Sequence, residues 1–526
     1  MQIQTYLKHL PSAMLLSAIL ASPAHAFCGF YAGKADASLF NRASQVILAR
    51  DGERTVISMQ NDYQGPLSEF VLVVPTPQAI KQGQVRIADK NVFKRLDEFS
   101  TPRLAEYHDE DPCRLENYWG PQMGYNMRMM PAPMAMAGAP MMEKAERAKQ
   151  LGVTIDAKFT LEEYDILSLS AKQSQGLEIW LRENGYQIPK GASSALAPYI
   201  KQGMKFFVAK VNLKEQKKTG FSYLRPLQFA FESPKFMLPM RLGMLNAEAG
   251  RAQDLIVYVL TRKGRVEAAN YRTKKLPANM NLPFFIKPQF GAFYQDMFEK
   301  QAKQDGYRSV FTEYFWDMNW CDPCAADPLS AEELQKAGVF WLSGNAIAGF
   351  QSMQAPGAQV KMPPLPQSGQ RDAMITRLHL RYTPESFPED LVLTQTRDNE
   401  NWQARYVIQQ PFSGDMQQCR EKAAKVDCAA ECKPRVEEVL RVQREEPKIL
   451  RPEWQQKSRD KLHAECLQSC NESKANGLKN ALQYYRVDLP NRLEQEKKTL
   501  SDLSGWSLQK IEQMPEAQRY SAAAKK

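Results

Sequence analysis

Two cysteines stand at a spacing that could carry thiol-disulfide chemistry. Cys321 and Cys324 lie in the stretch Trp-Cys-Asp-Pro-Cys, which resembles a thioredoxin-like redox site. In such a site the first cysteine begins a helix, and the helix dipole lowers the pKa of its thiol. Here a Ser-x-x-Glu capping box at Ser330 and Glu333 predicts that the helix begins only near Ala331. The helix therefore begins too far from Cys321 to activate its thiol.

A structural crosslink explains the two cysteines better than catalysis does. They could bond to each other in a local turn, or each could pair with Cys28 or Cys113. A thiol-disulfide oxidoreductase that uses Cys321 and Cys324 remains the alternative.

Methionines are concentrated between residues 120 and 148, in a segment rich in Met and Pro without a helix or strand period. We interpret this segment as a flexible insert. Thioether sulfur selects Cu(I), and Ag(I) is the related probe, so the insert could bind such an ion. It could equally contact an apolar partner or serve as a passive linker. The sulfur ligands would come from Met123, Met127, Met129, Met130, Met134, Met136, Met141 and Met142.

Histidines give little support for catalysis. After the first 26 residues, His108, His379 and His463 are the histidines of the chain, and they stand far apart without a recognisable catalytic motif. His108 precedes the acidic residues 109–111, which could bind a cation, although a solvated acidic turn is the simpler interpretation. The residue pattern therefore favours a protein that is not an enzyme without excluding catalysis.

Four cysteines near the C-terminus form two Cys-x3-Cys pairs, and each pair lies on one face of a predicted helix. Two such helices can be joined in antiparallel orientation by two disulfides. A four-thiolate zinc site is the alternative. Pro434 predicts that the first helix ends near Lys433. The simplest disulfides are Cys428–Cys470 and Cys432–Cys466.

The N-terminus predicts export. Residues 1–26 combine Lys8, a short apolar run over residues 13–22 and an A-x-A cleavage site that ends at Ala26. The run is too short to span a membrane, and no later run approaches that length. We therefore expect a periplasmic or secreted protein in which most of the nine cysteines form disulfides. The odd count leaves at least one cysteine unpaired or bonded to another molecule, and Cys419 is a candidate.

The formal net charge of +10 is spread along the chain without a long basic run. This distribution argues against nucleic acid as a partner and fits a protein that faces the anionic cell envelope. The expected partner is therefore an envelope protein or another envelope component.

Alternating and continuous apolar runs predict strands through most of the chain, with two short helices over residues 91–99 and 174–184. The expected fold class is α+β, with a largely antiparallel sheet and a C-terminal disulfide-stapled helical hairpin. We expect a β-rich domain over residues 27–412, and a hairpin with a charged tail over 413–526. The predicted strands include "QVILAR", "TVISMQ", "FVLVVP", "GVTIDAKF", "YDILSLS", "KFFVAKVNL", "LQFAFE", "DLIVYVLT" and "ITRLHLRY".

Several stretches, taken in order, resemble the bacterial secreted family called "domain of unknown function 2330". The resemblance spans roughly residues 27–410 and implies export, without an activity or catalytic residues. It also implies that Cys28, Cys113, Cys321 and Cys324 belong to the shared domain and that the other five cysteines belong to the extension. The matching stretches include "FCGFYAGKADASLFNRASQVILARDGERTVISMQ", "RLAEYHDEDPC", "GLEIWLRENGYQIP", "LPMRLGMLNA" and "ITRLHLRYTPESFPEDLVL".

Together these observations favour a non-enzymatic binding or structural module of the bacterial envelope.

Overall fold

The structure is a computed structural model. It describes residues 30–34, 40–64, 70–114, 152–184, 186–187, 191–219, 224–246, 252–322, 327–342, 371–445, 454, 456–515 and 517–518.

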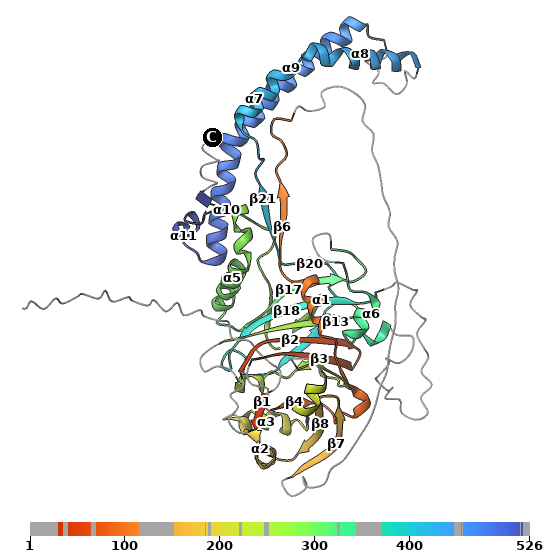
Figure 1. Ribbon diagram of the computed structural model, residues 1–526, viewed down its shortest axis with the longest axis vertical. Helices are drawn as coiled ribbons and strands as arrows, with labels where there is room; N and C mark the ends of the chain where they lie inside the picture. The colour runs from red at the N-terminus through yellow and green to blue at the C-terminus, as the bar shows by residue number, and fades with distance from the viewer. Residues whose placement is uncertain are drawn as a thin grey trace, which may run out of the picture.

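The described residues contain an antiparallel sheet of six strands (Figure 1). The continuous apolar run predicted to be a doubly buried strand is one of its central strands. Along it, Leu72 and Val74 point into one hydrophobic core and Val73 into another, as the two-residue period of a strand requires. In spatial order the strands are β7 (Val153–Leu161), β8 (Tyr164–Ala171), β10 (Lys205–Val211), β4 (Phe70–Thr76), β1 (Phe30–Lys34) and β9 (Tyr186–Gln187).

A second sheet has nine described strands. Its β2–β3 hairpin turns at Gly52, whose φ of 59° lies in the left-handed region that favours glycine. Two strand pairs in this sheet are parallel, and its other pairs are antiparallel. In order the strands are β15 (Arg272–Lys275), β17 (Ser309–Asp317), β18 (Met374–Tyr382), β13 (Gln253–Thr261), β2 (Phe40–Asp51), β3 (Arg54–Gln64), β11 (Leu227–Glu232) and β5 (Val85–Ile87), with β20 (Trp402–Gln403) beside β17.

The two sheets face each other across the largest apolar core, and helices cover their outer faces. Helices α2 (Ser174–Glu183) and α3 (Ala192–Lys201) pack on the six-stranded sheet. Helices α1 (Lys90–Ser100) and α6 (Ala331–Lys336) pack on the nine-stranded sheet. The capping box at Ser330 and Glu333 begins α6, as predicted. The chain thus forms four layers in the order helix, sheet, sheet, helix.

Smaller elements complete the body. Two sheets of three described strands are β12 (Met237–Leu238), β19 (Leu391–Gln395) and β14 (Val266–Ala268), and the parallel set β16 (Met280–Leu282), β21 (Arg405–Gln410) and β6 (Arg103–His108). The remaining helices are α4 (Leu213–Lys218), α5 (Phe290–Gln304) and the 3-10 turns η1 (Gln82–Gln84), η3 (Gly243–Asn246), η4 (Phe284–Gln289) and η5 (Phe340–Leu342).

After residue 412 the described chain is helical, and part of it extends away from the sheets (Figure 1). We call helices α7 (Met416–Lys425), α8 (Cys428–Glu445) and α9 (Arg459–Gln483) the helical arm. A π-helix, η8 (Tyr484–Asp488), leads into α10 (Leu489–Ser504) and α11 (Leu508–Glu512). Residues of α10 and α11 share an apolar cluster with α5, so the chain returns to the body after the arm.

The structure confirms the predicted α+β class with mostly antiparallel sheets, and it joins α8 to α9 by two disulfides, Cys428–Cys470 and Cys432–Cys466. The predicted helix end near Lys433 is wrong, because α8 continues through Pro434 to Glu445. Proline removes one backbone hydrogen bond. The disulfides and the apolar cluster between α8 and α9 offset that loss and keep the helix continuous.

Candidate functional site

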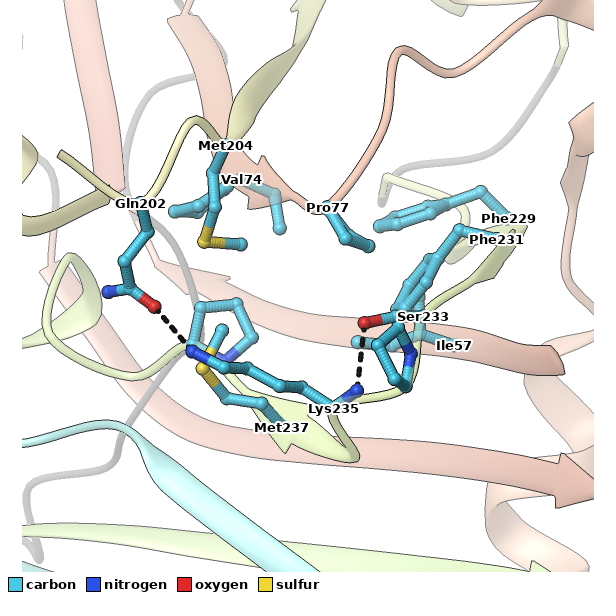
Figure 2. A pocket seen from close by; sticks show the side chains of 13 residues that line it. Ile57, Val74, Pro77, Gln202, Met204, Phe229, Phe231, Ser233, Lys235 and Met237 are labelled. Carbon is cyan, nitrogen blue, oxygen red and sulfur yellow. Dashed lines mark hydrogen bonds between the residues drawn. The ribbon is translucent and has the colours of Figure 1, made fainter. Parts of the chain in front are cut away.

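A cavity of about 200 Å³ opens where the two large sheets meet (Figure 2). Strand β4 of the six-stranded sheet lies on one side of it, and strands β3 and β11 of the nine-stranded sheet lie on the other. The turn between α3 and β10 and the segment that follows β11 supply the rest of the lining. The lining side chains are Ile57, Val74, Pro75, Pro77, Gln202, Met204, Phe229, Phe231, Ser233, Pro234, Lys235, Met237 and Pro239.

The inner part of this pocket is apolar because several strands direct alternate side chains toward it. Phe229 and Phe231 are two residues apart on β11 and therefore point to the same side of the sheet. Ile57 comes from the neighbouring strand β3, and Val74 comes from β4 of the facing sheet. Phe207 stacks on Phe229 with ring centroids 4.8 Å apart, which holds one wall in place.

Prolines supply four of the lining positions. Pro75 and Pro77 lie at the end of β4, and Pro234 and Pro239 flank the segment after β11. Proline has no backbone N–H, so these positions present apolar rings without amide donors. The prolines therefore favour apolar contact over hydrogen bonding to the backbone.

The segment after β11 is fixed by a buried arginine. The guanidinium of Arg50, which is 8% exposed, donates to the carbonyl oxygen of Ser233 at 2.9 Å and to Oγ1 of Thr55 at 2.8 Å. It also lies 4.8 Å from the ring centroid of Phe236. Burial lowers the pKa of Arg50. The backbone N–H of Ser233 donates to the carbonyl oxygen of Glu53, so the wall is held from two directions.

Three polar side chains reach the mouth: Gln202, Ser233 and Lys235. The ammonium Nζ of Lys235 donates to Oε1 of Gln202 at 3.0 Å, as Figure 2 shows. The Oγ of Ser233 accepts from the backbone N–H of Lys235 at 3.1 Å. No carboxylate is among the described residues that line the pocket, so Lys235 gives the mouth a positive charge.

A second concentration of polar groups is a buried ionic network on the nine-stranded sheet. Glu313, fully buried on β17, accepts a hydrogen bond from Nε of Arg377 and is 2.6 Å from Nδ1 of His379. The Nε2 of His379 lies 3.4 Å from Asp254, and the ring of Phe298 stacks on the imidazole at 3.8 Å. The partners of His379 are thus carboxylates and an aromatic ring, which is a stabilising arrangement without a nucleophile.

The acidic turn after His108 is solvated only at Glu110, whereas Asp109 and Asp111 pair with cationic side chains of the protein. Asp109 is 10% exposed and accepts two hydrogen bonds from Arg492, both 2.8 Å long. Asp111 pairs with Lys422. Neither here nor elsewhere among the described residues do three or more metal-binding side chains converge. The turn instead anchors the C-terminal helices to the body.

Cysteine placement corrects part of the sequence interpretation. Cys419 is not unpaired, because it forms a disulfide with Cys113, with Cα atoms 5.3 Å apart. This bond ties the predicted shared domain to the extension, and it removes Cys113 as a partner for Cys321. The four cysteines of the two Cys-x3-Cys pairs bond to one another as Cys428–Cys470 and Cys432–Cys466, so they form disulfides and not a zinc site.

Other predicted sites lie wholly or partly outside the described residues. Cys321 is exposed and forms no disulfide with a described residue, whereas Cys324 and Cys28 lie outside the described residues. The whole methionine-rich insert, 120–148, also lies outside them, as do residues 1–26. The redox and Cu(I) or Ag(I) hypotheses therefore stay predictions. None of the described helices is both long enough and apolar enough to cross a bilayer.

Sequence reasoning missed the pocket. Its lining comes from segments that extend from residue 57 to residue 239, and each of these segments looks like an ordinary strand or loop in the sequence. The only local signal is the repeated proline around β4 and after β11.

Comparison with known proteins identifies one family. A family model described as "Uncharacterized protein conserved in bacteria (DUF2330)" matches residues 22–394. No curated protein and no solved structure matches the chain. The matched span contains every residue that lines the pocket, whereas the helical arm lies beyond it.

Proposed function

The chain belongs to this bacterial family, and from that premise we propose that it is an exported, non-enzymatic binding protein of the cell envelope. Its ligand is a small, mainly apolar molecule that enters the pocket between the two large sheets. The observation that carries this proposal is the pocket itself, a cavity with an apolar interior and a few polar groups at one mouth. Ligand sites in proteins commonly have this composition.

Export is supported by two independent features. The N-terminus has the pattern of a cleaved signal sequence. Three disulfides, Cys113–Cys419, Cys428–Cys470 and Cys432–Cys466, are typical of proteins that fold outside the reducing cytoplasm. The periplasm or the extracellular space is therefore the proposed location.

The helical arm supports a role for an envelope partner. It extends away from the body that contains the pocket (Figure 1), and two disulfides join its helices α8 and α9. A body that binds a ligand and an arm that reaches another envelope component would together form a carrier or a sensor.

Titration with a neutral apolar fluorophore, N-phenyl-1-naphthylamine, tests the pocket. We expect saturable binding at one site. The variant Met204→Trp places an indole in the cavity, because Met204 lines it and is 7% exposed, and this should weaken binding at least tenfold. Ile179→Trp is the matched control, since Ile179 is 44% exposed on α2, and it should bind as the unmodified protein does. Equal affinity in Met204→Trp and the unmodified protein would overturn the proposal.

A further inference from the structure

We propose that the ligand of this pocket carries a carboxylate, and that Lys235 binds it at the mouth. The ligand class is a short-chain to medium-chain aliphatic carboxylate. This inference rests on the proposed function, because it specifies which molecule the same pocket accepts.

Charge is the first argument. Lys235 is the only charged side chain among the described residues that line the pocket. It forms no ion pair with any described residue; its ammonium has the neutral amide of Gln202 as its hydrogen-bond partner. A cation at the mouth of an apolar cavity, without an acidic neighbour in the lining, matches a ligand with one negative end and an apolar body.

Hydrogen-bonding capacity is the second argument. An ammonium group has three N–H donors, and Gln202 accepts from one of them. The amide nitrogen of Gln202 donates to the carbonyl oxygen of Pro198 at 3.2 Å, which orients its Oε1 toward Lys235. Gln202 therefore holds the ammonium across the mouth, as seen in Figure 2, and leaves two donors for a carboxylate.

The backbone under Lys235 is fixed, which is the third argument. Its N–H donates to Oγ of Ser233, and the carbonyl oxygens of Ser233 and Pro234 both accept from Arg50, at 2.9 and 3.4 Å. A preorganised segment loses little conformational entropy when a ligand binds. The ammonium is therefore presented at a defined place relative to the apolar interior.

Size sets the length of the apolar body. A cavity of about 200 Å³ lies below the usual range of about 300–1,000 Å³ for ligand sites, and one water in liquid occupies about 30 Å³. The interior therefore accepts a short chain of roughly six to ten carbons, and longer chains would extend out of the cavity. Phe229, Phe231 and Met204 would contact the chain.

Competition against bound N-phenyl-1-naphthylamine tests the inference with three probes of one chain length: octanoate, octanol and octylammonium. For the unmodified protein, octanoate should displace the fluorophore at a concentration about three- to fivefold lower than octanol, and octylammonium should be the weakest. The preference is modest because Lys235 is exposed to water. It should shrink as the salt concentration rises.

Variants assign the preference to one side chain. In Lys235→Gln, octanoate and octanol should displace the fluorophore at equal concentrations. In Lys235→Arg, the preference for octanoate over octanol should remain, because arginine keeps the positive charge. Lys214→Gln, a matched removal of an exposed lysine on α4, should change nothing. Since Lys235 is exposed, thermal unfolding of Lys235→Gln should match that of the unmodified protein.

The outcomes separate the two proposals. Equal displacement by octanoate and octanol in the unmodified protein would overturn the carboxylate inference and leave the apolar-ligand function intact. A carboxylate preference that survives in Lys235→Gln would overturn the role of Lys235. If neither the fluorophore nor any of the three probes binds, the proposed function fails as well.

Discussion

The carboxylate of Asp109 accepts two hydrogen bonds of 2.8 Å from the guanidinium of Arg492, a residue 383 positions further along the chain. Asp109 follows β6 of the body and Arg492 lies on α10. With the Cys113–Cys419 disulfide, this pair forms a joint between the family domain and the C-terminal helices. The acidic turn that resembled a cation site in the sequence therefore binds a protein cation.

Removing the Asp109 carboxylate should destabilise this joint. Although burial opposes ionisation, the hydrogen bonds from Arg492 and Tyr484 lower the pKa of Asp109. Asp109→Asn removes the charge that pairs with two nitrogens of the Arg492 guanidinium, so we expect a loss of about 3 kcal/mol in the free energy of unfolding, measured by urea denaturation. The control is Glu110→Gln. Glu110 belongs to an exposed ion pair with Arg114, and its loss should cost less than about 1 kcal/mol. Equal losses in both variants would refute the joint.

Replacing Glu496 should stabilise the protein near neutral pH. Glu496 is 2% exposed, neither of its carboxylate oxygens has a hydrogen-bond partner among the described residues, and its ion pair with Arg492 is long, at 3.5 Å. Burial raises its pKa to about 7, although the charge of Arg492 opposes this shift. An acid whose pKa is raised on folding favours the folded state at low pH, and that benefit is lost as the pH rises from about 4.5 to about 7.

Glu496→Gln should therefore raise the free energy of unfolding at pH 8, by about 3 kcal/mol at most, and have little effect at pH 4.5. Urea denaturation at the two pH values measures this difference. Glu494→Gln serves as the control, because the Glu494 side chain is 60% exposed on the same helix, and it should show no such dependence on pH. A stabilisation by Glu496→Gln that is the same at both pH values would contradict the assignment.

The buried network around Glu313 should give the protein a stability maximum in mildly acidic solution. Burial alone would raise the pKa of Glu313, but the charges of His379 and Arg377 lower it to about 2. Asp254 follows the same pattern, with its pKa lowered to about 2 by His379 and Arg381. The stabilisation of the folded state by each of these two ionised carboxylates is present above about pH 4 and is lost as the pH falls toward about 2.

For His379, burial would lower the pKa, but Glu313 and Asp254 raise it above its usual value. Its contribution is therefore complete below about pH 6.5 and is lost as the pH rises through the raised pKa. Glu313→Gln should cost about 3–5 kcal/mol at pH 6, since it removes the buried carboxylate that Arg377 and His379 share, and progressively less toward pH 2. Denaturation across this range tests both statements. The exposed Glu400→Gln variant should follow the unmodified protein, and a flat cost for Glu313→Gln between pH 6 and pH 2 would argue against the network.

The disulfides of the arm should stabilise it locally. Cys428–Cys470 and Cys432–Cys466 close segments with sequence separations of 42 and 34 residues. Removing one bridge by replacing both of its cysteines with Ala should cost about 3 kcal/mol. Amide hydrogen exchange in this variant should be faster in α8 and α9, while β4 and β11 stay protected.

Non-reducing peptide maps of protein from its native compartment should recover both bridges of the arm and Cys113–Cys419. Free thiols at these positions would disprove the pairing.

Local patterns fixed many elements correctly. The helices α1 and α2, the hairpins β2–β3 and β7–β8, and the antiparallel stapling of α8 to α9 depend on residues that are close in sequence or on a strict spacing. The helix end predicted near Pro434 is wrong, because two disulfides and apolar packing against α9 outweigh the tendency of proline to end a helix.

The sequence alone determined the export pattern, the fold class, the family and the covalent pairing within the arm, because hydrophobic period and cysteine spacing act over a few turns of chain. Only the tertiary structure revealed the pocket, the Arg50 contact with the segment after β11, the Asp109–Arg492 pair and the Cys113–Cys419 bond. Each of these joins segments that are distant in sequence, and such contacts depend on which sheets face each other and in which register. No local pattern encodes that choice, since the free energy of packing is shared among all the residues of the core.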